Sequence, residues 1–313
     1  MSRKIAIIGL GLIGQSWAVD FARAGAKVML WDNVEGVSDV AISKIKNLIK
    51  DLDSANLLDE LPQAIEKRIT VCRELHGALS NAEYVQENTP ENLDIKHKVF
   101  AAIEANALPN AVIASSTSGL LPSDMFHGLV SAKRFLVAHP LNPPHLIPAV
   151  ELVPGPATDT ISLNTAHTIL EETGHAVLKL NRETPGFVMN RLQGALLDEA
   201  FRLVDQGIIK PEDLDVAVRE GLAVRWSVVG PFEAIDLNAP GGITDYIDRY
   251  GPMYDDLAIG SEGRADWNGS LREQLSVHRR AKLSLDQIPS RTQWRDAQLA
   301  EIALNRKSRK LKT

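Results

Sequence analysis

The stretch that decides the fold is Lys4-Ile-Ala-Ile-Ile8, followed at once by Gly9-Leu-Gly11-Leu-Ile-Gly14. The first five residues have the pattern of a buried strand, and the glycines open a helix that we expect to run through Gln15–Ala24. Glycines at this spacing allow a tight turn, a close backbone approach to a pyrophosphate and close packing of the helix on the strand. The N-terminus of the helix favours the negative phosphates. The stretch therefore predicts a dinucleotide-binding unit.

Asp32 indicates which dinucleotide binds. It lies 18 residues beyond Gly14, at the end of the predicted second strand, Lys27–Trp31. A carboxylate there accepts hydrogen bonds from the adenosine ribose hydroxyls and repels a 2′-phosphate, which favours NAD over NADP. The alternative is a glycine-rich turn beside an aspartate that binds no ligand. We predict NAD as the cofactor, and we expect these residues to contact it: Gly9, Gly11, Leu12, Ile13, Gly14 and Asp32.

In the first half of the chain, short β-like runs alternate with helical stretches, which is the pattern of a parallel sheet with crossover helices. A long segment with helical spacing, Ser38–Ile65, separates the second strand from the third. The predicted strands are Lys4–Ile8, Lys27–Trp31, Ile69–Cys72, Glu83–Glu87, Ala111–Ser115, Arg134–Ala138 and Val177–Leu180.

The pattern changes after the last of these strands. The segment Asn181–Gly186 is typical of a linker, because the Thr184-Pro185 pair disfavours helix. Beyond it the sequence predicts helices only, at Phe187–Asp205, Pro211–Glu220, Pro231–Leu237, Thr244–Tyr250, Ser270–Leu283 and Arg291–Leu304. We therefore expect an α/β fold, with an N-terminal Rossmann-type, doubly wound and mostly parallel sheet in residues 1–183. An all-α domain follows in residues 184–313.

The composition argues against several classes of function. The chain has 313 residues, and a length of roughly 150 residues per domain suggests two domains. A net charge of -6 and 5% aromatic residues do not suit a nucleic-acid partner. The apolar runs are far shorter than the roughly 18 residues of a membrane span. Cys72 is the only cysteine, so the chain forms no intrachain disulfide and no thiolate metal site. We expect a cytoplasmic protein with no metal, membrane or nucleic-acid partner.

A second group of polar residues follows two other strands. Ser115-Ser-Thr-Ser118 and His139-Pro-Leu-Asn142 come at strand ends, where open α/β folds bind their ligands. A histidine there suits a general base for an alcohol, because its pKa of about 6.5 allows proton exchange near neutral pH. Glu151 lies in the apolar run Val150–Val153, where a carboxylate is unfavourable unless paired. Pairing with an imidazole would satisfy it and fix the tautomer.

Asn190 is a further polar candidate, in the first turn of the apolar helix after the linker. It either faces the site or serves as a capping or solvent-facing residue. Each candidate taken singly is also compatible with a satisfied polar group at the end of a strand or helix.

Together these segments resemble the L-3-hydroxyacyl-CoA dehydrogenase superfamily, and the resemblance covers nearly the whole chain. The motifs that carry it are Gly9–Gly14, Asp32, Pro90–Lys96, Ser116–Ser118, His139–Pro143, Glu151 and Thr184–Leu192. Within the superfamily the chain looks most like the lambda-crystallin / L-gulonate 3-dehydrogenase branch. The supporting segments include Ser115–Ser123, Val137–Pro144, Glu220–Trp226 and Gln293–Asp296.

The resemblance implies an NAD-dependent oxidoreductase that acts on a CH–OH group. It implies that His139 is the catalytic base and that Glu151 orients it. Ser118 and Asn190 would hold the reacting oxygen.

The resemblance also implies further cofactor contacts. Asn142 would lie near the nicotinamide, Ser118 would contribute to the cofactor site, and Glu91 and Lys96 would contact the cofactor. It further implies a two-domain subunit that forms a homodimer.

One segment departs from the acyl-CoA enzymes, which usually have Gly-Tyr-Pro-Met-Gly-Pro-Phe-Glu where this chain has Leu222-Ala-Val-Arg-Trp-Ser-Val-Val-Gly-Pro-Phe-Glu233. The change introduces Arg225, whose planar guanidinium suits a substrate carboxylate. A structural ion pair with Glu220 or Glu233 is the alternative. We expect a small L-3-hydroxy acid such as L-gulonate as the substrate. The alternatives are an L-3-hydroxyacyl-CoA such as 3-hydroxybutyryl-CoA, and L-carnitine.

Two other classes fit the residues less well. The 6-phosphogluconate-type dehydrogenases use a catalytic lysine four residues before the helix asparagine, and this chain has Gly186 there. A non-enzymatic NAD-binding or bulk structural protein has no use for a base such as His139.

Overall fold

The computed structural model describes residues 2–227, 230–236, 238–239 and 242–257, together with short stretches and single residues between 281 and 304. The chain forms two compact units, one of residues 1–190 with 289–313 and one of residues 191–288. The predicted helix Ser270–Leu283 lies almost wholly outside the described residues, and Arg291–Leu304 lies largely outside them. The domain boundary predicted at residue 183 stays a prediction.

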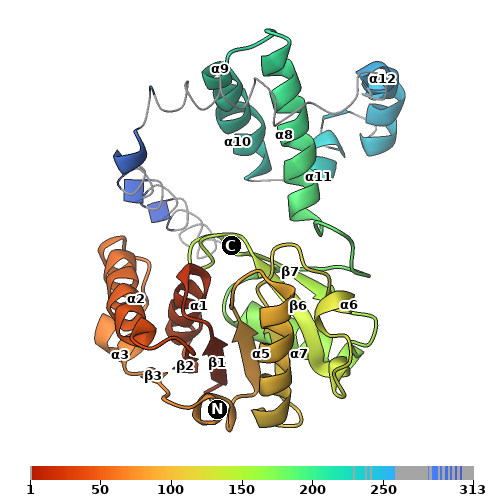
Figure 1. The fold of residues 1–313 in the computed structure, drawn as a ribbon. Coiled ribbons are helices and arrows are strands. Elements are labelled where there is room, and N and C mark those ends of the chain that lie inside the picture. Colours follow the sequence, from red (N-terminus) through yellow and green to blue (C-terminus); the bar gives the residue numbers. More distant parts are fainter. Residues whose placement is uncertain are drawn as a thin grey trace. The chain divides into compact units, whose positions relative to one another are not determined.

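The first unit is built on one mixed sheet (Figure 1). Its strands are β1 (Lys4–Ile8), β2 (Lys27–Trp31), β3 (Ile69–Val71), β4 (Tyr84–Glu87), β5 (Val112–Ser115), β6 (Phe135–Pro140), β7 (Ala149–Pro154) and β8 (Ala176–Lys179). They lie in the order β3-β2-β1-β4-β5-β6-β7-β8. Neighbouring strands are parallel except β6 and β7, which are antiparallel. The predicted mostly parallel, Rossmann-type sheet is confirmed.

Helices cover both faces of this sheet because its strands are apolar on both sides. Ile5 and Ile7 of β1 are buried in one core, with side chains from α1 (Leu12–Arg23), α2 (Val37–Ser54) and α7 (Thr160–Glu172). Ala6 and Ile8 point to the opposite face and are buried in a second core. Its other members come from α4 (Leu75–Leu79), α5 (Leu93–Asn106) and α6 (Pro122–Met125). The sheet is therefore doubly wound, as predicted.

Two details differ from the sequence-based expectations. The run around Glu151 forms a full strand, β7, which was not among the predicted strands. The insertion between β2 and β3 divides into α2 and the short α3 (Pro62–Glu66). The remaining short element of this unit is a 3₁₀ turn, Ala132–Arg134, directly before β6.

The described part of the second unit contains helices and no strand (Figure 1). They are α8 (Met189–Asp205), α9 (Pro211–Val216), α10 (Ala223–Trp226), α11 (Pro231–Asp236) and α12 (Gly242–Leu257), with a π-helical turn, Ala217–Leu222, between α9 and α10 and a 3₁₀ turn, Leu285–Gln287. The chain leaves α8 through Gly207, whose φ of 68° lies in the left-handed region that favours glycine. Among the described helices, none is long and apolar enough to cross a membrane.

Candidate active site

The candidate residues gather at one edge of the sheet because β1, β2, β4, β5 and β6 all run in the same direction. The strand order changes direction between β1 and β4, and open α/β sheets bind ligands at such a switch point, outside the carboxyl ends of the strands. The glycine turn follows β1, and the predicted Glu91 and Lys96 follow β4. Ser118 follows β5, and His139 is the penultimate residue of β6.

Glycine is found at positions 9, 11 and 14 for three different structural reasons. Gly9 has a φ of 86°, and a Cβ there would lie 2.8 Å from the Asn88 carbonyl carbon. A Cβ on Gly14 would lie 2.0 Å from the carbonyl oxygen of Gly9, so only glycine lets the helix pack this closely. Gly11 has an ordinary φ of -67°, and a Cβ there would meet no atom of the described residues within 4 Å. Its open surroundings leave room for a ligand to approach the backbone.

The N-terminus of α1 fits a phosphate group. Among the described residues no side chain caps it, so within that part of the chain the first N–H groups of the helix remain available for an anion. Asp32 lies at the end of β2 and orders the turn, because its Oδ2 accepts a hydrogen bond from the Leu10 backbone N–H at 2.8 Å. Its Oδ1 accepts one from the Val34 backbone N–H at 2.9 Å. Each oxygen keeps a second acceptor position for a ribose hydroxyl. The residues therefore fit NAD.

His139 and Glu151 are direct neighbours across the antiparallel pair β6 and β7. The Nδ1 of His139 lies 2.7 Å from the Oε2 of Glu151, and the Glu151 side chain is fully buried. A carboxylate only accepts hydrogen bonds, so Nδ1 carries the hydrogen and the neutral imidazole has its lone pair on Nε2. Among the described residues, none forms a hydrogen bond with that Nε2. The pairing that the sequence suggested is therefore present.

The other oxygen of Glu151 is held by the chain that opens α8. The backbone N–H groups of Val188 and Met189 donate to Oε1 at 2.7 and 2.9 Å. Gly186 and Phe187 direct these groups to the carboxylate through a turn in which both have a positive φ, 75° and 49°. Burial tends to raise the pKa of Glu151, but the hydrogen bonds from His139, Met189 and Val188 outweigh it and lower that pKa below its ordinary value.

Phe187 also fixes the histidine ring from the side. It is fully buried, and its ring centroid lies 5.6 Å from that of His139 with the planes tilted by 56°. Glu151 therefore fixes the tautomer of His139 and Phe187 limits its rotation.

Asn190 is tied to the loop that follows β5. Its Nδ2 donates to the backbone oxygen of Ser118 at 2.6 Å. The same loop is bound by Glu91, whose Oε1 accepts hydrogen bonds from the N–H groups of Ser118 and Gly119 at 3.0 and 3.1 Å and from the Thr117 hydroxyl. Glu91, Ser118 and Asn190 are thus linked, and Ser118 itself is exposed.

Comparison with known proteins identifies the family. The family models described as "3-hydroxyacyl-CoA dehydrogenase, NAD binding domain" and "3-hydroxyacyl-CoA dehydrogenase, C-terminal domain" match residues 4–184 and 186–259. The chain belongs to the 3-hydroxyacyl-CoA dehydrogenase family. It is therefore an NAD-dependent oxidoreductase of a family that acts on 3-hydroxyl groups, and the resemblance found from the sequence motifs is confirmed.

Relatives within this family carry different names. The chain is 36% identical to lambda-crystallin of Oryctolagus cuniculus, over 96% of this chain and 95% of the relative. It is 36% identical to L-carnitine dehydrogenase of Streptomyces coelicolor, over 80% and 78% of the two chains. Among solved structures it resembles 5-formyl-3-hydroxy-2-methylpyridine 4-carboxylic acid 5-dehydrogenase, an NAD⁺ dependent dismutase. That match has a TM-score of 0.82 and 28% identity, over 96% and 97% of the chains.

Lys96 forms a buried ion pair with Glu87. Its side chain is 1% exposed, and its Nζ lies 2.9 Å from both carboxylate oxygens of Glu87, which is fully buried. Glu87 was not among the residues singled out from the sequence, because an acid at the end of an apolar strand gives no sign of its partner. The cofactor contacts predicted for Lys96 and Glu91 stay predictions, as does that of Asn142, an exposed residue in the turn after β6.

Arg225 belongs to the second unit, at the end of α10, and its side chain is exposed. The alternative partner Glu220 is bound instead by Arg219, at 2.5 Å. Glu233 lies outside the described side chains. The hydrogen bond with Tyr254 has the largest effect on Tyr246 of α12 and raises its pKa, whereas the positive charge of Arg225 has a smaller, lowering effect.

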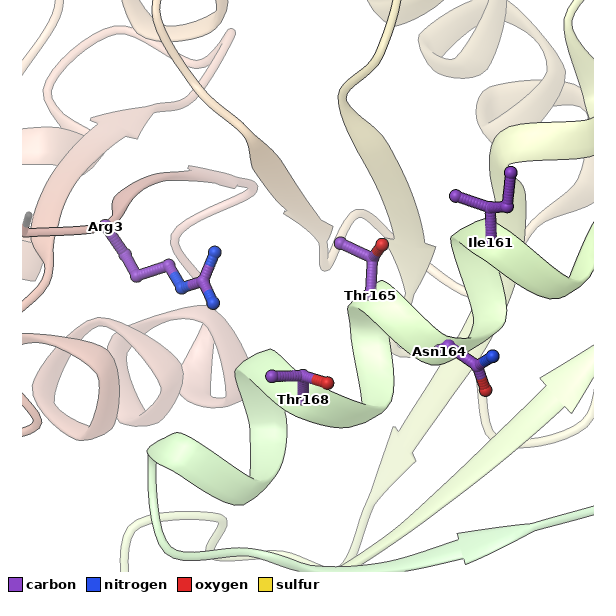
Figure 2. A pocket seen from close by; sticks show the side chains of 5 residues that line it. All are labelled: Arg3, Ile161, Asn164, Thr165 and Thr168. Carbon is purple, nitrogen blue, oxygen red and sulfur yellow. The ribbon is translucent and has the colours of Figure 1, made fainter.

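A surface hollow of about 420 Å³ lies elsewhere, between Arg3 and α7 (Figure 2). Its other lining residues, Ile161, Asn164, Thr165 and Thr168, all come from that helix. Arg3 precedes β1, at the amino edge of the sheet and therefore opposite the glycine turn. Its guanidinium is already paired with Glu83 and Glu172, so the hollow offers no free charge from this residue.

Proposed function

We propose that the protein oxidises the 3-hydroxyl of a small L-3-hydroxy acid, such as L-gulonate, with NAD, in the cytoplasm and as a homodimer. The observation that carries the chemical part is the His139–Glu151 pair, in which Nε2 remains an unbonded acceptor among the described residues. The residues that would hold NAD are the glycine turn, the N-terminus of α1 and Asp32. When bound, NAD supplies the hydride acceptor.

The chain's own residues would perform the proton chemistry. His139 Nε2 accepts the proton of the substrate hydroxyl, and the ring becomes an imidazolium. Glu151 stabilises that charge because its carboxylate is kept ionised by the Val188 and Met189 N–H groups. Ser118 and Asn190 donate hydrogen bonds to the reacting oxygen. General base catalysis of this kind typically contributes about 10²–10⁴-fold.

Arg225 supports a free acid as the substrate. Its guanidinium is exposed, and among the described residues Glu220 is paired with Arg219 and not with Arg225. A planar guanidinium suits bidentate binding of a carboxylate. The similarity to lambda-crystallin over nearly the full length of both chains supports the same branch of the family.

L-Carnitine is the second candidate, and one observation favours it. Tyr246, Tyr250 and Tyr254 form an aromatic cluster on α12, with ring centroids 4.7 Å apart for the first pair and 6.4 Å apart for the first and third. Aromatic rings of this kind bind quaternary ammonium groups. A relative named L-carnitine dehydrogenase shares 36% identity with the chain.

A substrate panel tests the proposal. The purified protein is given NAD with L-gulonate, L-3-hydroxybutyrate, L-carnitine or L-3-hydroxybutyryl-CoA, and NADH formation is followed by absorbance. We expect the highest kcat/KM with a free hydroxy acid and the lowest with the thioester. The His139→Gln variant, prepared in the same way, controls for contaminating dehydrogenases. A preference for the thioester would contradict the proposed substrate class, and a preference for L-carnitine would select the second candidate.

A further inference from the structure

We propose that Glu87 is a positioning residue: acting through Ser115 and the buried Lys96, it fixes the loop that carries Ser118 and that accepts a hydrogen bond from Asn190. The inference rests on the proposed function for the roles of Ser118 and Asn190. Its starting point is the burial of two opposite charges, because Glu87 is fully buried and Lys96 is 1% exposed.

The Glu87 carboxylate is saturated with donors. Lys96 Nζ lies 2.9 Å from each oxygen, and the Ser115 hydroxyl donates to Oε2 at 2.6 Å. The Thr89 backbone N–H donates to Oε1 at 2.7 Å, and the Thr89 hydroxyl donates to the same oxygen. Lys96 also donates to the Thr89 carbonyl at 3.2 Å. We call this group, Glu87, Thr89, Lys96 and Ser115, the clamp.

The clamp joins three elements at the edge of the sheet where the candidate site lies. Glu87 is the last residue of β4 and Ser115 is the last residue of β5, and the two are register partners. Lys96 comes from the first turns of α5. The clamp therefore sets the starting points of both loops, the one that leads to Glu91 and the one that leads to Ser118.

Hydrogen bonds lead from the clamp to the candidate site. The Ser115 hydroxyl accepts from the Thr117 N–H at 3.3 Å, and Glu91 then binds Thr117, Ser118 and Gly119. The Ser118 carbonyl accepts from Asn190. Displacement of the clamp would therefore move the two groups that we propose to hold the reacting oxygen, while the glycine turn and Asp32 keep their own contacts.

The stability of the fold does not by itself explain why a charged pair is buried here. Buried ion pairs are often no more stabilising than apolar residues of the same volume, whereas removal of one partner leaves an uncompensated charge. What the charged pair adds here is directional bonding between two loops, which an apolar pair does not provide.

The test uses Glu87→Gln, Lys96→Met and the double variant, with Arg134→Met as a matched control. Arg134 is also a buried cation, 5% exposed, and its guanidinium binds the carbonyls of Leu108 and Ala111. It lies directly before β6, at the opposite edge of the sheet. The readouts are kcat, KM for NAD, and hydrogen–deuterium exchange of the peptide that covers residues 112–121.

For Glu87→Gln we expect kcat to fall about tenfold or more, since small displacements of positioning groups have effects of this size. KM for NAD should change by a smaller factor than kcat, because the glycine turn and Asp32 keep their own contacts. Exchange at residues 118 and 119 should become faster. Arg134→Met should lose stability without these effects.

Unchanged kcat and unchanged exchange in folded Glu87→Gln would overturn the proposal, as would equal effects in Arg134→Met. If Glu87→Gln does not fold, the same kcat and exchange measurements on the double variant test the proposal, because that variant leaves no unpaired charge in the core. If the wild type oxidises none of the substrates, the proposed function fails, while the exchange data still decide whether the clamp holds the loop.

Discussion

At the scale of single residues, the chemistry depends on where one proton can go. The Nδ1 of His139 is hydrogen-bonded to Glu151 and its ring contacts Phe187, so Nε2 is the nitrogen that has no hydrogen-bond partner in the described part of the chain. Replacement by glutamine keeps a polar side chain of similar reach but removes the base. We expect His139→Gln to lower turnover by about 10²–10⁴-fold. NADH affinity, measured by fluorescence titration, should stay unchanged; turnover near the wild-type rate would remove His139 from the mechanism.

Glu151 makes a pH-dependent contribution to folding. Its pKa is lowered in the folded protein, because its hydrogen bonds outweigh burial, so its stabilisation is fully present above the unfolded value of about 4.3. It is lost as the pH falls through the lower folded pKa. We expect Glu151→Gln to reduce the free energy of unfolding by about 1–3 kcal/mol at pH 7, because buried donors lose their carboxylate partner.

Urea unfolding at neutral and acidic pH measures this contribution. The difference between wild type and Glu151→Gln should shrink at pH values below the unfolded pKa. A difference that stays the same down to the acid-unfolding range would mean that Glu151 is not held as a carboxylate.

At the scale of elements, two glycines of the same turn have different roles: Gly14 allows the packing of α1 on β1, and Gly11 leaves room for a ligand. Gly14→Ala would place a Cβ 2.0 Å from the Gly9 carbonyl oxygen, so we expect strong destabilisation of the contact between β1 and α1. Gly11→Ala meets open space and an ordinary φ, so we expect a wild-type Tm. Because the added methyl group would occupy the approach of a pyrophosphate, the same variant should bind NADH at least about tenfold more weakly.

Thermal unfolding and NADH titration of the two variants test this separation. Wild-type NADH affinity in Gly11→Ala would mean that no phosphate approaches the backbone there. A wild-type Tm for Gly14→Ala would show that the helix can move away from the strand.

Element patterns were also the part of the structure that sequence reasoning could predict. Apolar runs and the glycine turn are local signals, so all seven predicted strands and α8 were located to within a few residues. The pairing of His139 with Glu151 could also be predicted, because a lone acid in an apolar run needs a partner. The clamp could not be predicted from the sequence. Glu87 and Lys96 meet only through the packing of α5 beside β4, which no local pattern of charge encodes.

At the scale of the whole molecule, the two units carry different parts of the proposed function. The first contains the glycine turn, His139 and Glu151, which are the residues that we propose for cofactor binding and proton transfer. We propose that the helical unit contributes to substrate specificity. Its candidate for binding the substrate carboxylate is Arg225. A substitution of Arg225 should therefore raise KM for the hydroxy acid and leave KM for NAD unchanged.

Arg225→Met tests this division, because methionine keeps much of the side-chain volume and removes the charge. We expect KM for the free hydroxy acid to rise about tenfold or more, the size expected for loss of a charge-assisted bidentate pair. KM for NAD should not change. Arg219→Met is the matched control, because Arg219 is a nearby exposed arginine whose guanidinium is already paired with Glu220. If both variants keep the wild-type KM for the hydroxy acid, Arg225 does not bind the substrate carboxylate, and specificity must come from other residues.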